Sequence, residues 1–259
     1  MKKIEDRLNT KQGHWILAKM GKKVLRPGGK ELTLKLIDCM DIPNADVVEF
    51  APGLGYTASV ALKKQPKSYT GVEINEEAAQ LLRKKLHGKK HQIIIGNAAD
   101  LKLENESVDR VYGEAMLTMQ ADHRKSEIIQ EAHRILKNGG RYGIHELGLE
   151  PNDLQEATKS TIQRELARVN KVNARPLTVQ EWSELLTKEG FRIVHVDTNP
   201  MHLLKPKRII DDEGFLRTVK IVFNILTHPK ERKRILTMRR TFKKYQDHLN
   251  AVAIVAEKV

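Results

Sequence analysis

The chain has 259 residues, of which 40% are hydrophobic and 31% are charged. A chain of this length buries a sizeable core, and this balance excludes an intrinsically disordered protein. The formal net charge is +13, and the single cysteine, Cys39, excludes an intramolecular disulfide. Because no apolar run approaches the roughly 18 residues of a spanning helix, and the first residues lack the apolar stretch of a secretory signal, we expect a cytoplasmic protein.

Two helices open the predicted fold. An amphipathic stretch over residues 13–25 predicts the first helix, and residues 30–40 predict the second. The turn Arg26-Pro27-Gly28-Gly29 separates them. We group residues 1–45 as an N-terminal helical cap.

Strands and helices then alternate, because short apolar runs are separated by longer amphipathic ones. The expected strands are residues 46–50, 69–72, 92–95, 108–112, 142–147, 191–196 and 251–256. The expected helices between them are residues 56–64, 75–86, 123–136, 153–172 and 178–188. This alternation predicts an α/β fold with a mostly parallel seven-stranded sheet and helices on both faces. In such sheets, ligands bind at the carboxyl ends of the strands.

A long basic segment precedes the last strand. Residues 200–259 hold fourteen Lys or Arg against six Asp or Glu. Two helices are expected here, over residues 213–226 and 229–248, and the first has an apolar stripe made of Phe215, Val219, Val222, Phe223 and Leu226. The regions after the cap are therefore a core (46–198), a basic helical insertion (199–250) and a final core strand (251–259).

A glycine loop follows the first strand of the core. Gly53 and Gly55 lie between that strand and a helix start. Glycine lets a backbone approach a ligand closely, and the free amides of a helix start can meet an anionic group. Glu73 ends the second strand, where a carboxylate can accept both hydroxyls of a ribose. Two cofactors share this pattern, because residues 53–58 also match the dinucleotide pattern G-x-G-x-x-G/A.

Further segments distinguish the two cofactors. They are Glu49 and Ala51 before the glycines, Gly96-Asn97-Ala98 after the third strand, Ser107-Val108-Asp109 at the fourth, and Glu131 to Arg141 before the fifth. With them the chain resembles the class I S-adenosylmethionine-dependent methyltransferases, in particular the small-molecule group that includes the ubiquinone and menaquinone biosynthesis methyltransferases. Ala51 stands where this family has its first glycine. The resemblance covers roughly residues 30–150.

The resemblance implies a Rossmann-like core with helices before it, and S-adenosyl-L-methionine as the cofactor. The helical insertion ahead of the last strand is an addition to the plain family fold, which joins its last two strands closely. The cofactor-binding residues that it implies are Glu49, Ala51, Gly53 and Gly55 for the methionine part, Glu73 for the ribose, and Ile74, Asn97 and Ala98 for the adenine. The cofactor carries an activated methyl group, so the protein mainly orients the acceptor and excludes water.

The catalytic candidates lie after the fourth strand and in the fifth. Glu114 and His145 are candidates for a general base, since an ordinary histidine titrates near neutrality. A structural role for the histidine, and a hydrogen-bonding or capping role for the glutamate, are the alternatives. Candidates for the substrate pocket are His14, Trp15, Met116 and Glu146, although Trp15 and Met116 also suit plain packing. No cysteine cluster or paired-histidine motif indicates a metal site.

The sequence thus predicts a methyltransferase that transfers a methyl group to O, N or C of a small molecule. The alternatives are an NAD-dependent oxidoreductase on a related fold and a non-catalytic cofactor-binding or RNA-associated protein. The basic insertion suits an acidic or phosphate-bearing substrate, and it also suits contact with nucleic acid or an anionic membrane. We favour a lid that packs its apolar stripe on the core over such a contact surface.

Overall fold

The computed structural model describes residues 12–86, 88 and 90–259. Its strands are β1 (Asp46–Phe50), β2 (Ser68–Glu73), β3 (His91–Ile95), β4 (Val108–Glu114), β5 (Leu136–Leu149), β6 (Leu177–Thr178), β7 (Phe191–Pro200) and β8 (Leu249–Lys258). They form one sheet in the order β3-β2-β1-β4-β5-β8-β7, and the two-residue β6 pairs with β5. The pairs from β3 to β5 are parallel, whereas β8 is antiparallel to both neighbours. The predicted α/β fold is confirmed, and β6 is the one strand of the described residues that lies outside the prediction.

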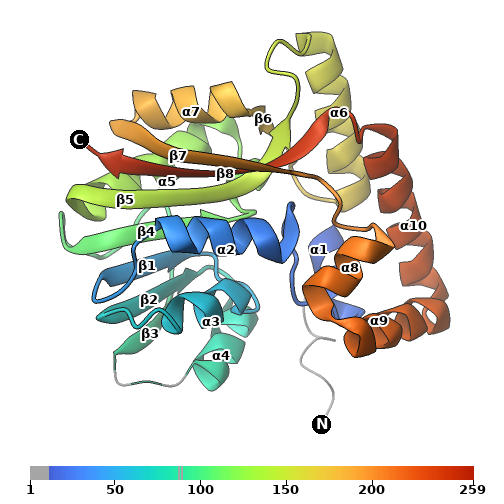
Figure 1. Ribbon diagram of the computed structural model, residues 1–259, viewed down its shortest axis with the longest axis horizontal. Helices are drawn as coiled ribbons and strands as arrows, with labels where there is room; N and C mark the ends of the chain where they lie inside the picture. The colour runs from blue at the N-terminus through green and yellow to red at the C-terminus, as the bar shows by residue number, and fades with distance from the viewer. Residues whose placement is uncertain (1–11, 87, 89) are drawn as a thin grey trace.

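The helices cover both faces and one end of this sheet (Figure 1). They are α1 (Gly13–Lys19), α2 (Gly29–Cys39), α3 (Tyr56–Leu62), α4 (Glu76–Lys85), α5 (Asp122–Ile135), α6 (Glu156–Asn170), α7 (Val179–Lys188), α8 (Pro206–Glu213), α9 (Phe215–Thr227) and α10 (Pro229–Lys244). Asn75 caps α4 by accepting a hydrogen bond from the Ala78 amide, and Thr178 and Glu181 form the capping box that opens α7.

Alternating residues of the strands face two separate apolar layers. Val48 packs in the layer that α5 and α7 cover, whereas Val47 packs in the layer that α2, α3 and α4 cover. This follows from the two-residue period of a strand. Because both faces are buried, the parallel strands read as continuous apolar runs.

A third apolar cluster joins the helices at one end of the sheet. It contains Ile16 of α1, Leu166 of α6 and Met238 of α10, together with Leu147 and Leu149 from the end of β5. Helix α6 lies in the segment predicted as core, yet it packs against α10 of the insertion. The apolar cluster at this end of the sheet is therefore built from helices far apart in the sequence.

A buried ion cluster ties the insertion to the chain between α1 and α2. The Nζ atom of Lys22 lies 3.4 Å from an Asp212 oxygen and 3.6 Å from a Glu213 oxygen, and all three side chains are buried. Glu213 also accepts hydrogen bonds from the amides of Lys23 and Val24. Burial lowers the pKa of Lys22, and the two carboxylates oppose that shift. Helix α8, which is not among the predicted helices, ends in these two acids.

The apolar stripe of α9 is exposed to solvent. Its members are Phe215, Val219, Val222, Phe223 and Leu226. The expected packing of this stripe on the core is wrong, because α9 turns its opposite side, with the buried Ile221, toward the protein. None of the helices in the described ranges combines the length and apolar character that crossing a bilayer requires.

Replacing Lys22 with methionine tests the ion cluster. The variant leaves two carboxylates buried without their cation, so we expect the free energy of unfolding to fall by about 3–5 kcal/mol in urea denaturation. The matched control is Lys64→Met, which breaks an exposed pair with Asp38 (2.6 Å) and should cost less than about 1 kcal/mol. Equal losses in the two variants would contradict the anchoring role of Lys22.

Candidate active site

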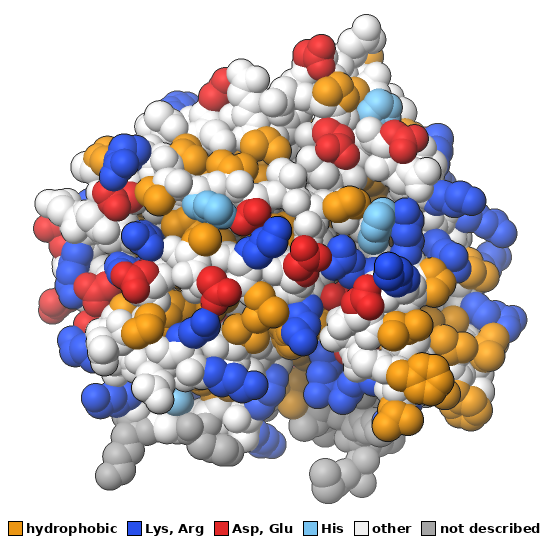
Figure 2. Space-filling view, viewed as in Figure 1, with side chains coloured by type: hydrophobic (Ala, Val, Ile, Leu, Met, Phe, Trp, Pro, Cys, Tyr) orange, Lys and Arg blue, Asp and Glu red, His pale blue; other side chains and the backbone are white. Residues whose placement is uncertain are grey.

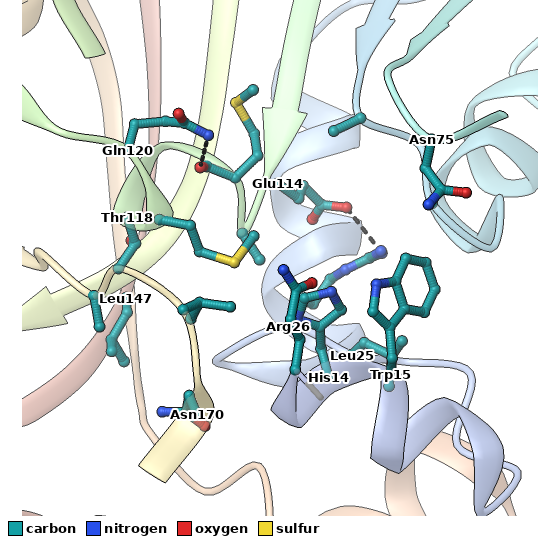
Figure 3. A pocket seen from close by; sticks show the side chains of 18 of the residues that line it. His14, Trp15, Leu25, Arg26, Asn75, Glu114, Thr118, Gln120, Leu147 and Asn170 are labelled. Carbon is teal, nitrogen blue, oxygen red and sulfur yellow. Dashed lines mark hydrogen bonds and ion pairs between the residues drawn. The ribbon is translucent and has the colours of Figure 1, made fainter. Parts of the chain in front are cut away.

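A cavity of about 600 Å³ opens at the carboxyl ends of β1, β2 and β4 (Figure 3). β1 lies between β2 and β4, where the strand order reverses, as expected for a ligand site in such a sheet. The predicted site residues that line the cavity are Ala51, Gly53, Glu73, Ile74, Asn97, Ala98, Glu114, Met116, His14 and Trp15. The predicted site residues that are buried and do not line the cavity are Glu49, Gly55, His145 and Glu146.

The two predicted glycines of the loop serve different purposes. A Cβ atom added to Gly53, which has a φ of 56°, would meet nothing closer than the Ala51 carbonyl oxygen at 3.9 Å. This position therefore faces open space in the cavity wall. A Cβ atom at Gly55 would lie 2.6 Å from a Leu82 methyl group, so Gly55 allows the loop to pack on α4. Ala51 adopts a φ of 51°, in the left-handed region that a glycine adopts without strain.

The ends of β2 and β3 supply groups suited to a nucleoside. The Glu73 carboxylate accepts hydrogen bonds from the amides of Gly53 and Asn75, each at 3.0 Å, and its burial raises its pKa. Ile74 beside it is 72% exposed, although it is a large apolar side chain. The Asn97 side-chain oxygen accepts from the Ala99 amide at 3.1 Å. These groups surround open space and fit the nucleoside of S-adenosylmethionine. The carboxylate can accept the ribose hydroxyls, and the uncovered apolar side chain and the amide side chain suit the adenine.

Glu49 is held beneath the loop by two tyrosines. Its carboxyl group accepts hydrogen bonds from Tyr69 (2.5 Å) and Tyr112 (2.9 Å) on the two neighbouring strands. Burial raises the pKa of Glu49 to about 7, and the nearby charge of Glu114 adds to the rise. In this arrangement Glu49 braces three strands under the loop, while the cavity wall above it consists of backbone and small side chains.

Four side chains surround the Glu114 carboxylate at the end of β4. One oxygen accepts a hydrogen bond from Thr33 and lies 2.7 Å from Nδ1 of His145. The other oxygen pairs with Arg26 (2.9 Å) and accepts a hydrogen bond from Thr57. Burial alone would raise the pKa of Glu114, but the Arg26 charge and the hydrogen bonds lower it to about 2. Glu114 is therefore ionised and only accepts hydrogen bonds, so His145 donates from Nδ1.

His145 and Glu146 lie behind this carboxylate. The His145 ring is fully buried, and its Nε2 finds no partner in the described part of the chain. Both oxygens of Glu146 accept hydrogen bonds from the turn after β4, from the amides of Met116, Leu117 and Thr118 and from the Thr118 hydroxyl. Glu146 thus fixes the turn that lines the cavity.

An apolar wall lines the same cavity as the glycine loop. Its residues come from α1, the link between α1 and α2, the end of β5, α6 and the insertion, and they include Leu17, Leu25, Leu147, Leu166, Leu203, Met238 and Phe242. His14 lies in this wall beside Trp15, with ring centres 4.9 Å apart. Burial lowers the pKa of His14 to about 4, so its ring is neutral at neutral pH.

Sequence analysis did not identify Arg26 or the wall residues of α6 and α10. Arg26 belongs to a Pro-Gly turn that predicts only a break between helices, and its partner Glu114 is far away in the sequence. The wall residues look like ordinary core positions of amphipathic helices. Among the residues that the structure describes, no group of three His, Cys, Asp or Glu side chains is placed to hold a metal ion.

Comparison with known proteins identifies a methyltransferase domain in this chain. Residues 48–144 match the model of a methyltransferase domain. An uncharacterized protein of Haemophilus influenzae is 34% identical over 256 residues, which cover 95% of this chain and 98% of that protein. In structure, the chain superimposes with a TM-score of 0.72 on phosphoethanolamine N-methyltransferase 2 of Haemonchus contortus in complex with S-adenosyl-L-methionine, at 16% identity, covering all of this chain and 60% of that one. The MccD protein gives a TM-score of 0.68 at 17% identity and covers 90% and 99% of the two chains.

The domain match, the fold and the site define a class I S-adenosylmethionine-dependent methyltransferase, with S-adenosylmethionine as its cofactor. Within that class, the chain belongs to the same family as the Haemophilus influenzae protein.

Glu73→Ala tests the assignment of the ribose site. S-adenosylhomocysteine at about 100 times its dissociation constant stabilises a protein by roughly 2.7 kcal/mol, which raises the melting temperature of a chain of this size by about 5 °C or more. We expect thermal unfolding to show that rise in the parent protein and its loss in the variant, because the hydroxyls lose their acceptor. Glu76→Ala removes an exposed carboxylate one turn away and should keep the full rise. A rise that persists in Glu73→Ala would move the ribose site elsewhere.

Proposed function

We propose that this methyltransferase acts on a small, mainly apolar acceptor molecule bound between the glycine loop and the helical wall. The observation that carries the proposal is the apolar wall itself, which lines the same cavity as the cofactor loop. Such walls bury the body of a small ligand, while a few polar groups fix its orientation. Polar side chains of the cavity lining that are available for that purpose include His14, Asn170, Asn173, Thr118 and Gln120.

An acidic or phosphate-bearing acceptor has less support. Helix α10 contributes Met238 and Phe242 to the cavity, whereas Arg239 and Arg240 are exposed on the outside of the same helix. Of the basic side chains that line the cavity, Arg26 pairs with Glu114, Arg124 pairs with Glu127, and Lys23 is exposed to solvent. We therefore do not propose a phosphorylated acceptor for this chain, although the name of the Haemonchus contortus enzyme contains one.

The bound cofactor supplies an activated methyl group, and the residues of this chain position the acceptor and exclude water. A carboxylate that already accepts from four groups and has a pKa of about 2 is a weak proton acceptor. We therefore assign Glu114 and His145 a positioning role, in which they hold Arg26 at the cavity and Thr57 at the start of α3. His14 is neutral and lies in the cavity wall, so its ring can accept a hydrogen bond from an acceptor hydroxyl or amine.

The finer assignments stay predictions. These are the likeness to the ubiquinone and menaquinone enzymes, the methylated atom, the cytoplasmic location and the division into cap, core and insertion. An NAD-dependent oxidoreductase is not favoured, because the methyltransferase domain covers the glycine loop and β2.

Val172→Phe tests the location of the acceptor site. Val172 is half-buried in the cavity wall just beyond α6. A larger side chain there occupies space that the acceptor would fill, and it leaves the cofactor residues at the ends of β1, β2 and β3 unchanged. In a screen of small acceptors with labelled cofactor, we expect kcat/KM for the best acceptor to fall by about tenfold or more, with unchanged affinity for S-adenosylhomocysteine. Val194→Phe, on the exposed face of β7, is the control and should behave like the parent. Methylation of RNA or protein in place of every small acceptor would contradict the proposed function.

Glu114→Gln separates a positioning role from that of a general base. With the best acceptor from that screen, we expect kcat to fall by about 10-fold to 100-fold, while the pH–rate profile keeps its shape. If Glu114 were the base, the acidic limb of the profile would disappear in the variant. Thr33→Val, which removes one donor to the same carboxylate, should give a smaller loss of kcat.

The stability of Glu114→Gln provides a second readout. The folded pKa of Glu114, about 2, lies below the ordinary value of 4.5. The carboxylate therefore stabilises the parent above pH 4.5, and this stabilisation is lost as the pH falls toward 2. The difference in unfolding free energy between parent and variant should shrink over that range.

A further inference from the structure

Helix α9 presents an uncovered apolar face. The α9 face consists of Phe215, Leu216, Val219, Val222, Phe223 and Leu226. Leu216 is 85% exposed, Phe215 69% and Phe223 64%. At 100° per residue these positions fall within an arc of about 120°, so the side chains form one continuous strip. Figure 2 shows apolar side chains gathered over α9 and the adjoining part of α10. An apolar patch of this kind on a globular protein marks a contact surface.

Basic side chains flank the α9 face. From Phe215 to Lys244 the chain holds ten Lys or Arg and a single acid, Glu231. Lys220 is exposed at the edge of the face, and Lys230, Arg232 and Lys233 are exposed in the first turns of α10. The surface therefore combines an apolar strip with a strongly positive surround.

We propose that the α9 face docks on an anionic lipid bilayer. An apolar strip that inserts among acyl chains, beside cations that meet lipid phosphates, is the physical signature of a helix lying in a membrane interface. The 13 residues of α9 extend about 20 Å, short of the roughly 30 Å hydrocarbon core, so the helix lies along the surface and does not span it.

The charge argues against the other occupants. A second copy of the chain, docked face to face about a twofold axis, would bring two basic α10 helices together at the cost of repulsion. RNA would meet the cations but would leave the aliphatic members of the strip, such as Leu216 and Leu226, without a matching partner. A bilayer with anionic headgroups satisfies both components.

Contacts connect the α9 face to the cavity. The Asn224 side chain donates a hydrogen bond to the Met20 carbonyl at 3.0 Å, and Glu231 pairs with Lys19 at 3.0 Å. Both contacts reach α1, which carries His14 and Trp15 in the cavity wall. Docking would thus hold the acceptor side of the cavity close to the lipid surface.

Vesicle co-sedimentation with the full chain tests the proposal. The vesicles are phosphatidylcholine alone, or phosphatidylcholine mixed with phosphatidylglycerol. We expect binding to the mixed vesicles that weakens with salt, and little binding to phosphatidylcholine alone. The double variant Leu216→Ser/Phe223→Ser should weaken binding by about tenfold or more, since it removes two inserted side chains. Arg232→Gln and Lys233→Gln should each weaken binding by about fivefold.

The matched control is Val194→Ser/Val196→Ser, which removes exposed apolar side chains from β7 and should bind like the parent. Three results would overturn the proposal. They are an absence of binding of the parent to the mixed vesicles, binding of the α9 double variant as tight as that of the parent, and a dimer in light scattering that this double variant dissociates. RNA binding that survives the double variant, without vesicle binding, would assign the cations to nucleic acid.

Discussion

The active site depends on one buried carboxylate. Glu114 ends β4, and it receives Arg26 from the link before α2, Thr33 from α2, Thr57 from the start of α3 and His145 from β5. A charge out of water is tolerated only when its partners are fixed around it. Those partners therefore determine where the chain before α2 lies over the sheet, and α1 lies directly before that link.

The cofactor half of the cavity follows from local rules, whereas the acceptor half does not. The glycine loop, Glu73 and Ile74 lie at strand ends because β1 and β2 are parallel neighbours, and the loop must turn within a few residues. The facing wall is assembled by tertiary packing of α1, α6 and α10, and by the buried Lys22 cluster that anchors α8. Members of a family that keep the first half and change the second can change their acceptor while they keep their cofactor.

This contrast explains which features of the fold and the site can be predicted from the sequence. β1 is predicted residue for residue. Most of the predicted cofactor residues line the cavity, because periodicity and glycine placement are local signals; they are Ala51, Gly53, Glu73, Ile74, Asn97 and Ala98. The role of Arg26 depends on a partner distant in the sequence, and burial of His145 depends on the layers packed around β5. Apolar periodicity in α9 correctly indicated a helix, but periodicity does not tell whether an apolar stripe meets the core or another medium.

The insertion uses three chemically different surfaces on two adjoining helices. Met238 and Phe242 of α10 close the cavity, the exposed cations of α10 face solvent, and the α9 face is apolar and uncovered. A lid that served only to exclude water would bury the larger apolar stripe and would not need the concentrated charge. An insertion that both completes an apolar acceptor site and attaches to an anionic surface needs all three. Such an arrangement suits an acceptor that partitions into lipid, because the acceptor then reaches the apolar wall without crossing much water.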